Sequence, residues 1–179
     1  MLHTATLHKP HVATHSRQSF VDTNISGTLT LLEEATAAGV GAFVFTSTTS
    51  TFGDALTPAP GEPAAWITKS VIPIPKTSTE RLNIISATTP FTQSDLAELR
   101  SNAPSVVERI VPDYKAVYDS LGWTMYPEID RVYVNARALS ALGWQPKYDF
   151  LHVLNAFSQG DDPCSALARE IGTKHYHRV

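Results

Sequence analysis

One stretch, residues 43–53, constrains the fold of this chain most. It opens with the apolar run Phe43-Val-Phe45, continues into six hydroxyl side chains from Thr46 to Thr51, and ends in phenylalanine and Gly53. An apolar run that is not interrupted by polar residues is typical of a strand buried in a parallel sheet. Open α/β sheets collect ligands and chemistry at the carboxyl ends of their strands. The stretch therefore predicts a buried active-site strand over residues 41–47.

The segment before this strand has the pattern of an amphipathic helix. Over residues 17–38 apolar side chains recur at three- and four-residue spacing, and Gly39 follows where a helix commonly ends. The apolar positions are Val21, Ile25, Leu29, Leu32 and Ala35. Residues 1–5 have the composition of the tail of a strand. Strand tail, helix, glycine turn and strand indicate part of a βαβ unit, so we expect a parallel α/β layer over residues 1–53.

The remainder of the chain is predicted to be mostly helical. Residues 54–80 carry five prolines and cannot form one continuous helix, and residues 83–87 are a short strand candidate. Thr92 followed by Asp95 is a helix-start signal. Helical patterns cover residues 93–101, 105–111, 113–121, 135–142, 150–157 and 164–171.

Composition excludes several classes of protein. The chain has 179 residues, of which 42% are hydrophobic and 17% charged, so it can bury a core. A net charge of −3 without a Lys/Arg cluster argues against a nucleic-acid partner. No apolar run approaches the roughly 18–20 residues that cross a bilayer, and no secretory leader is recognisable. With a single cysteine, a cytoplasmic protein without a membrane partner is expected.

Two further groups of reactive side chains are open to more than one interpretation. His3, His8, His11 and His15 lie in or beside a polar stretch that has no cysteine and no closely spaced carboxylate, so a surface loop is favoured over a metal site. Cys164 follows a proline at a predicted helix start, a position that lowers a thiol pKa modestly. Because no His/Asp pair lies near it in the sequence, a structural role is favoured.

Three blocks of the sequence resemble the extended short-chain dehydrogenase/reductase family, the NAD-dependent epimerase/dehydratases. The blocks are His3-Thr-Ala5 with Asn24-Ile-Ser-Gly27-Thr28; residues 43–53; and residues 82–87 with 138–146, the latter similar to the family's A-x-x-x-L-G-W-x-P segment. The resemblance implies an α/β fold with a partial Rossmann-type parallel sheet, whose first three strands are missing, and a mostly helical C-terminal lobe. Residues 1–80 would form a partial NAD(P)-binding region, and residues 81–179 a substrate-lobe-like region.

The resemblance also implies a chemistry. Family members transfer a hydride between a nicotinamide, NAD or NADP, and a C–OH or C=O group of a small-molecule, sugar-nucleotide-like substrate. Thr48 falls on the family's catalytic Ser/Thr, whose hydroxyl holds the reacting oxygen. Cofactor-binding positions are implied at Ala5, Thr6, Asn24, Thr46 and Ser47. No metal is implied.

Two elements of the family pattern are absent. The chain has no glycine before Gly27, and therefore no G-x-x-G-x-x-G turn to seat a pyrophosphate. None of its six tyrosines has a lysine four positions on, so the Y-x-x-x-K acid/base pair is missing. We expect that three strands and a segment near residues 77–80 are deleted, and that the polypeptide is inactive. The alternatives are a non-catalytic interaction module, which forms a homo-oligomer or pairs with an intact paralogue, and a fragment of an intact oxidoreductase.

Overall fold

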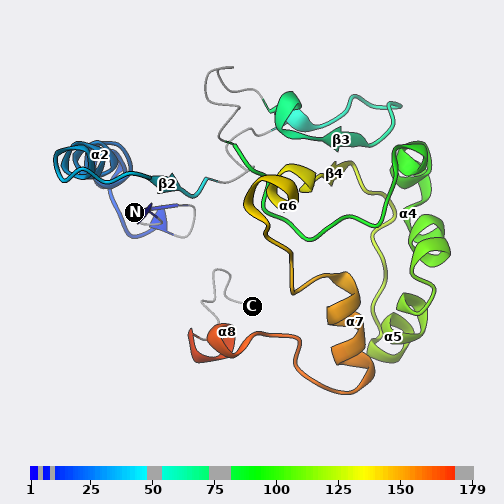
Figure 1. Ribbon diagram of the computed structural model, residues 1–179. Coiled ribbons are helices and arrows are strands. Elements are labelled where there is room, and N and C mark those ends of the chain that lie inside the picture. The colour runs from blue at the N-terminus through cyan, green and yellow to red at the C-terminus, as the bar shows by residue number, and fades with distance from the viewer. Residues whose placement is uncertain (4–5, 9–10, 48–53, 73–81, 172–179) are drawn as a thin grey trace. The chain divides into compact units, whose positions relative to one another are not determined.

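A computed structural model describes residues 1–3, 6–8, 11–47, 54–72 and 82–171 (Figure 1). The chain divides into two compact units, one built on Met1–Thr51 and the other on Phe52–Ile171.

The first unit is a βαβ arrangement. Strand β1 (Leu2–His3) pairs in parallel with β2 (Val44–Phe45), so that Leu2 lies opposite Val44 and His3 opposite Phe45. One continuous helix connects them, formed by α1 (Arg17–Val21), the π-helical segment η2 (Asp22–Ser26) and α2 (Gly27–Ala37). Gly39 follows with a φ of 64°, which is the left-handed conformation that ends many helices. The helix predicted over residues 17–38 and the strand at the N-terminus are confirmed.

Strand β2 differs from the prediction in length and in burial. It covers two residues, and Val44 and Phe45 are 50% and 55% exposed. The helix face predicted to pack inward is also open, because Val21, Ile25, Leu29 and Leu32 are exposed and Ala35 alone of the predicted positions is buried. The prediction of a buried strand is wrong here because, in the part of the chain that is described, the sheet has only two strands. A strand needs neighbours and layers on both faces to lose its contact with water.

The second unit combines helices with another parallel strand pair. Strand β3 (Ala65–Ile67) pairs with β4 (Arg131–Tyr133). The helical elements are η4 (Lys69–Val71), η5 (Gln93–Asp95), α4 (Leu96–Ile110), α5 (Tyr114–Leu121), α6 (Ala136–Leu142), α7 (Phe150–Ser158) and α8 (Ala166–Ile171). The predicted helices are confirmed. The two predicted over 93–101 and 105–111 form one element that kinks at Asn102, shortly before Pro104.

The core of the second unit is centred on α4. Leu99, Ala103 and Val106 are fully buried and pack with Ala64 and Val132. A second cluster joins α4 to α5 and α7, which Figure 1 shows along one side of the unit; its members are Val107, Val111, Tyr114, Val117 and Leu154. Among the described residues, no helix is long and apolar enough to cross a membrane.

Two predictions for the second unit need correction or remain open. Residues 83–87 are irregular rather than a strand. Side chains, rather than a neighbouring strand, donate to two backbone carbonyls of this part of the chain: Asn135 Nδ2 to that of Ser86 at 2.8 Å, and Arg137 Nε to that of Leu82 at 3.2 Å. Residues 54–72, which the sequence assigned to the first region, lie in the second unit through the pairing of β3 with β4. The boundary at residues 80 and 81 stays a prediction.

Candidate functional site

The carboxyl ends of β1 and β2 lie at one edge of the parallel pair. The chain leaves β1 after His3 and β2 after Phe45, which are paired residues. The amide of Thr46 donates to the carbonyl of His3 at 3.3 Å, so the two chains are still connected one residue beyond the strand. Thr46 and Ser47 are exposed. The first hydroxyls of the predicted cluster therefore lie in contact with solvent at the edge where parallel sheets bind ligands.

Asn24 hydrogen-bonds the connecting helix to the chain that follows β1. Its Nδ2 donates to the carbonyl oxygen of Leu7 at 2.8 Å, and its Oδ1 accepts from the amide of Leu7 at 2.7 Å. The hydroxyl of Thr6 donates to the same Oδ1 at 3.0 Å. A primary amide thus satisfies the donor and the acceptor of one backbone residue together, and both acceptor sites of Oδ1 are occupied.

The π-helical segment explains why a glycine follows Asn24 three residues later. The backbone N–H of Gly27 donates to the carbonyl of Asp22, the five-residue hydrogen bond of a π-helix. A Cβ atom at position 27 would lie 3.3 Å from that carbonyl oxygen, which is closer than ordinary van der Waals contact. Glycine therefore suits the wider turn that carries Asn24.

His3 and Thr28 form a second connection between β1 and the helix. His3 is 5% exposed, and its Nε2 lies 2.9 Å from Thr28 Oγ1. Its ring also contacts the rings of Phe43 and Phe45, at centroid distances of 5.9 and 5.5 Å. The first block of the resemblance, H-x-A with N-x-x-G-T, thus consists largely of residues that hold β1 against the helix.

The predictions for the histidines have different outcomes. A surface loop is wrong for His3, because the aromatic side chains of β2 and the adjoining Phe43 cover its ring. It is confirmed for His8 and His15, which are exposed. Within the described ranges, no group of three or more His, Cys, Asp or Glu side chains is arranged to hold a metal ion.

Cys164 also differs from its prediction. It is exposed and lies upstream of α8, which begins at Ala166. The amide of Cys164 donates to Asp162 Oδ1 at 2.9 Å. The hydrogen bond of the thiol to the Asp162 carboxylate, and then the negative charge of that group, raise the pKa of the thiol. The predicted lowering is wrong because the group beside the sulfur is an anion rather than the start of a helix.

Of the predicted site residues, four fall within the described chain. The structure joins Thr6 to Asn24, and it places Thr46 beside the backbone of His3, with Ser47 next in the chain. Ala5 and Thr48 lie outside the described residues. The assignment of these six residues to cofactor binding and catalysis stays a prediction.

The described residues of the first unit do not fit the pyrophosphate of a dinucleotide. Such a group is normally seated on free backbone N–H groups at a glycine-rich helix start. The helix of this unit begins at α1, where the Ser16 hydroxyl already accepts from the amide of Ser19 at 3.1 Å. The side chains of Thr6 and Asn24 are engaged with each other and with Leu7. No chemical step through a nicotinamide is therefore derived from this geometry.

A parallel βαβ unit with hydroxyl side chains at its carboxyl edge defines a protein of the α/β class. Residues 1–80 match the model of the NAD dependent epimerase/dehydratase family. The resemblance predicted from the sequence is confirmed over that range.

The similar proteins share only a short stretch with this chain. It is 47% identical over 53 residues to a UDP-glucose 4-epimerase of Rhizobium leguminosarum bv. trifolii, which is 30% of this chain and 16% of the relative. It is 45% identical over 53 residues to a UDP-glucose 4-epimerase of Rhizobium meliloti (strain 1021), with the same coverage. The chain thus spans 16% of the length of the curated relatives that it matches. No solved structure is detectably similar.

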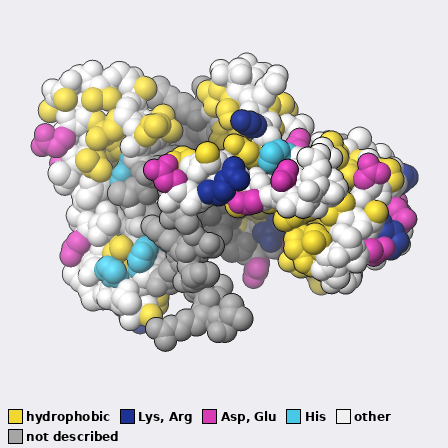
Figure 2. All heavy atoms as spheres, turned by 90° about the horizontal axis from the view of Figure 1, so that it is seen from below, with side chains coloured by type: hydrophobic (Ala, Val, Ile, Leu, Met, Phe, Trp, Pro, Cys, Tyr) yellow, Lys and Arg dark blue, Asp and Glu magenta, His cyan; other side chains and the backbone are white. Residues whose placement is uncertain are grey.

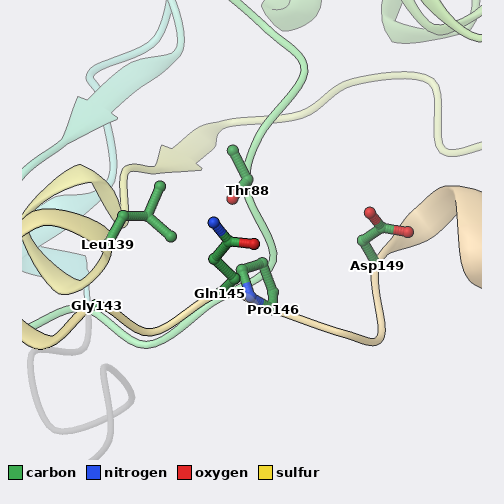
Figure 3. A pocket seen from close by; sticks show the side chains of 6 residues that line it. All are labelled: Thr88, Leu139, Gly143, Gln145, Pro146 and Asp149. Carbon is green, nitrogen blue, oxygen red and sulfur yellow. The ribbon is translucent and has the colours of Figure 1, made fainter.

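The second unit contains a pocket that the sequence does not predict (Figure 3). Its volume is about 380 Å³, and it is lined by Thr88, Leu139, Gly143, Gln145, Pro146 and Asp149. Gly143 and Asp149 could be recognised in the sequence only as helix-ending residues, since Gly143 ends α6 and Asp149 caps α7. Neither role indicates a pocket. Only the folded chain brings Thr88, some fifty residues upstream, to the same place.

Proposed function

We propose that this chain derives from an NAD(P)-dependent epimerase/dehydratase of the short-chain dehydrogenase/reductase type, with a Rossmann-type sheet, and that the polypeptide by itself does not catalyse hydride transfer. In such an enzyme the hydride moves between the nicotinamide and a C–OH or C=O group of a sugar-nucleotide-like substrate. Thr48 would correspond to the hydroxyl that holds the reacting oxygen, and Ala5, Thr6, Asn24, Thr46 and Ser47 to the wall beside the cofactor.

One structural observation supports the proposed lack of activity. The polar side chains that follow β1 are paired with the chain itself, since Asn24 uses its Oδ1 and Nδ2 atoms on Leu7 and receives the hydroxyl of Thr6. The sequence supports the same conclusion, because it has neither a glycine-rich turn before Gly27 nor a tyrosine with a lysine four positions on. Loss of a general acid/base by itself typically lowers a rate by roughly 10²- to 10⁴-fold.

The test is an epimerisation assay on purified polypeptide whose full length has been verified by mass spectrometry. UDP-glucose is the first substrate to use, because it appears in the names of the similar proteins. We expect no 4-epimer to form above background with either NAD or NADP. Cofactor-dependent epimerisation that scales with protein concentration would show that the proposal is wrong.

A second candidate is a non-catalytic interaction module. The observation in its favour is that several apolar side chains of the first unit are exposed, among them Leu2 at 79% and Ile25 at 64%. Hydrophobic side chains (yellow) are visible at the left of Figure 2. With two strands in the described sheet, strand edges are open to pairing with another chain. The occupant would be a second copy of this chain or an intact paralogue.

Light scattering on the purified chain tests this candidate. Val44→Lys places a charge on β2 at a half-exposed position, and we expect it to shift a dimer or larger species toward monomer. Val12→Lys is the matched control, because Val12 is 66% exposed and lies outside the strands. A wild-type chain that stays monomeric at all concentrations would exclude pairing with a second copy and leave only an intact paralogue as the partner. Peptides with a Y-x-x-x-K pair in the native protein would instead identify the chain as a fragment of an intact oxidoreductase.

A further inference from the structure

Three imidazole rings lie close together on the chain between β1 and the connecting helix. The rings of His8 and His11 are 5.0 Å apart between centroids, and those of His11 and His15 are 5.5 Å apart. Backbone hydrogen bonds bring them together, because the His11 amide donates to the His8 carbonyl at 2.8 Å and the His15 amide to the His11 carbonyl at 2.9 Å. His8, His11 and His15 are called the histidine turn below.

One hydrogen bond in the histidine turn requires a neutral imidazole. The backbone N–H of His8 donates to Nδ1 of His11 at 3.0 Å. A ring nitrogen accepts a hydrogen bond only while it carries no proton, and both ring nitrogens are donors in the imidazolium form. Because the His8 carbonyl also accepts from the His11 amide, the two residues are paired reciprocally. Protonation of the His11 ring removes one half of this pair.

Protonation also brings like charges close together. Imidazolium rings whose centroids are 5.0 and 5.5 Å apart repel one another, although water weakens the repulsion because His8 and His15 are exposed. The connecting helix begins at Arg17 with Ser16 as its cap. The positive end of its dipole therefore lies next to His15 in the chain and disfavours a further positive charge there.

No neighbouring charge compensates for this repulsion in the described part of the first unit. Besides the histidines, its charged groups are the amino terminus and the side chains of Arg17, Asp22, Glu33 and Glu34. The amino terminus donates to the Ala42 carbonyl, and the Asp22 carboxylate accepts from Gln18. None of these groups forms an ion pair with His11 or His15.

We propose that the histidine turn is a pH-dependent switch, closed while its imidazoles are neutral and open when they are protonated. Imidazole is the side chain whose charge ordinarily changes between pH 5 and 8, and histidine clusters switch conformation in this way. The turn follows Leu7, whose N–H and C=O groups are bound by the amide of Asn24, which does not titrate. Opening is therefore expected to leave Leu7 in place. The inference goes beyond the proposed function, because it requires neither a nicotinamide nor a substrate.

Amide hydrogen exchange of the full-length chain, followed by nuclear magnetic resonance at about pH 7.5 and about pH 5, tests the switch. We expect the protection factor of the His8 amide, corrected for the intrinsic exchange rate, to fall about fivefold or more at the lower pH, because one hydrogen bond is lost and repulsion is gained. The Leu7 amide is the internal reference and should keep its protection. An unchanged protection factor at His8 overturns the proposal. An equal fall at Leu7 also overturns it, because the whole unit would then be unfolding.

Two variants and a control assign the effect to the His11 ring. His11→Asn offers a side-chain acceptor that does not titrate, and His11→Phe removes the acceptor. In both variants we expect the protection factor of the His8 amide to be independent of pH. His152→Asn removes a histidine of the second unit and should retain the full fall. A fall that persists in the His11 variants, or that is lost in His152→Asn, contradicts the switch. Because the readout involves no catalysis, its failure is distinct from a failure of the proposed function.

Discussion

At the scale of single residues, short polar side chains of the first unit hydrogen-bond the connecting helix to β1 and to the chain that follows it. Asn24 holds Leu7, Thr28 holds His3, and the missing side chain of Gly27 admits the π-helical turn. These residues were singled out in the sequence because they resemble the H-x-A and N-x-x-G-T patterns of the epimerase/dehydratases. The contacts of Asn24 with Leu7 and of Thr28 with His3 could not be predicted, because they join positions that are 17 and 25 residues apart. Hydrogen-bond partners at that separation depend on the fold rather than on local pattern.

Replacing Asn24 tests this fastening. Asn24→Ala removes three hydrogen bonds and leaves the N–H and C=O of Leu7 without their partner. We expect the first unit to lose about 1–3 kcal/mol of stability, and hydrogen exchange at the Leu7 amide to become faster. Thr30→Ala, on the exposed surface of α2, is the control and should leave that exchange rate unchanged. Equal protection of Leu7 in both variants would contradict the role given to Asn24.

The reactivity of Cys164 is a second prediction at this scale. Because the Asp162 carboxylate raises the pKa of the thiol, a smaller fraction is thiolate at neutral pH, and alkylation by iodoacetamide should be slow. Asp162→Asn removes the charge and should increase the rate, with the pH midpoint of the reaction moving down. Asp161→Asn removes a carboxylate next in sequence and is the control. If both variants react at the wild-type rate, Asp162 does not control the thiol.

At the scale of elements, the helices were predicted more completely than the strands. Spacing of apolar residues indicated the connecting helix of the first unit and the helices of the second, because a helix is encoded within a few turns. Strands β3 and β4 have three residues each, too few for a period to be recognised. Residues 83–87 have the apolar composition of a strand, but Asn135 and Arg137 hydrogen-bond to the carbonyls of Ser86 and Leu82.

The start of α4 provides a pH-dependent prediction. The Asp95 carboxylate accepts from the amide of Thr92 at 2.7 Å and from its hydroxyl at 2.8 Å, and lies 3.1 Å from Arg109. These hydrogen bonds, first that of the Thr92 amide, lower the pKa of Asp95. The stabilisation is therefore fully present above the ordinary aspartate pKa of about 3.9, and is lost as pH falls through the lower pKa of the folded state.

Urea unfolding of Asp95→Asn measures this contribution. At pH 7 we expect a loss of about 1–2 kcal/mol from the second unit, since a helix cap and a charge-assisted hydrogen bond are weakened. The difference from wild type should shrink as the pH is lowered below the ordinary aspartate pKa. Glu98→Gln is the control, because Glu98 contacts the same arginine at 2.8 Å but is about half exposed and should matter less. A loss of stability that is the same at pH 7 and below the ordinary aspartate pKa would contradict the stabilising role given to the Asp95 carboxylate.

At the scale of the whole molecule, the two units differ in what the sequence revealed. The first lies within the range that matches the epimerase/dehydratase family model, and several residues of the matching motif hold its elements together. The proposed inactivity rests on the Y-x-x-x-K pair, which the given sequence does not contain. The pocket of the second unit was not recognisable, because Thr88, Gln145 and Asp149 meet only after folding.

We propose that, within the described residues, the carboxyl edge of β1 and β2 has no seat for the pyrophosphate of a dinucleotide. Isothermal calorimetry of the full-length chain with NADH and with NADPH tests it most directly. We expect no saturable heat up to about 1 mM cofactor. A saturable isotherm in the micromolar range, abolished by Ser47→Trp at the exposed edge but not by Val12→Lys, would contradict it.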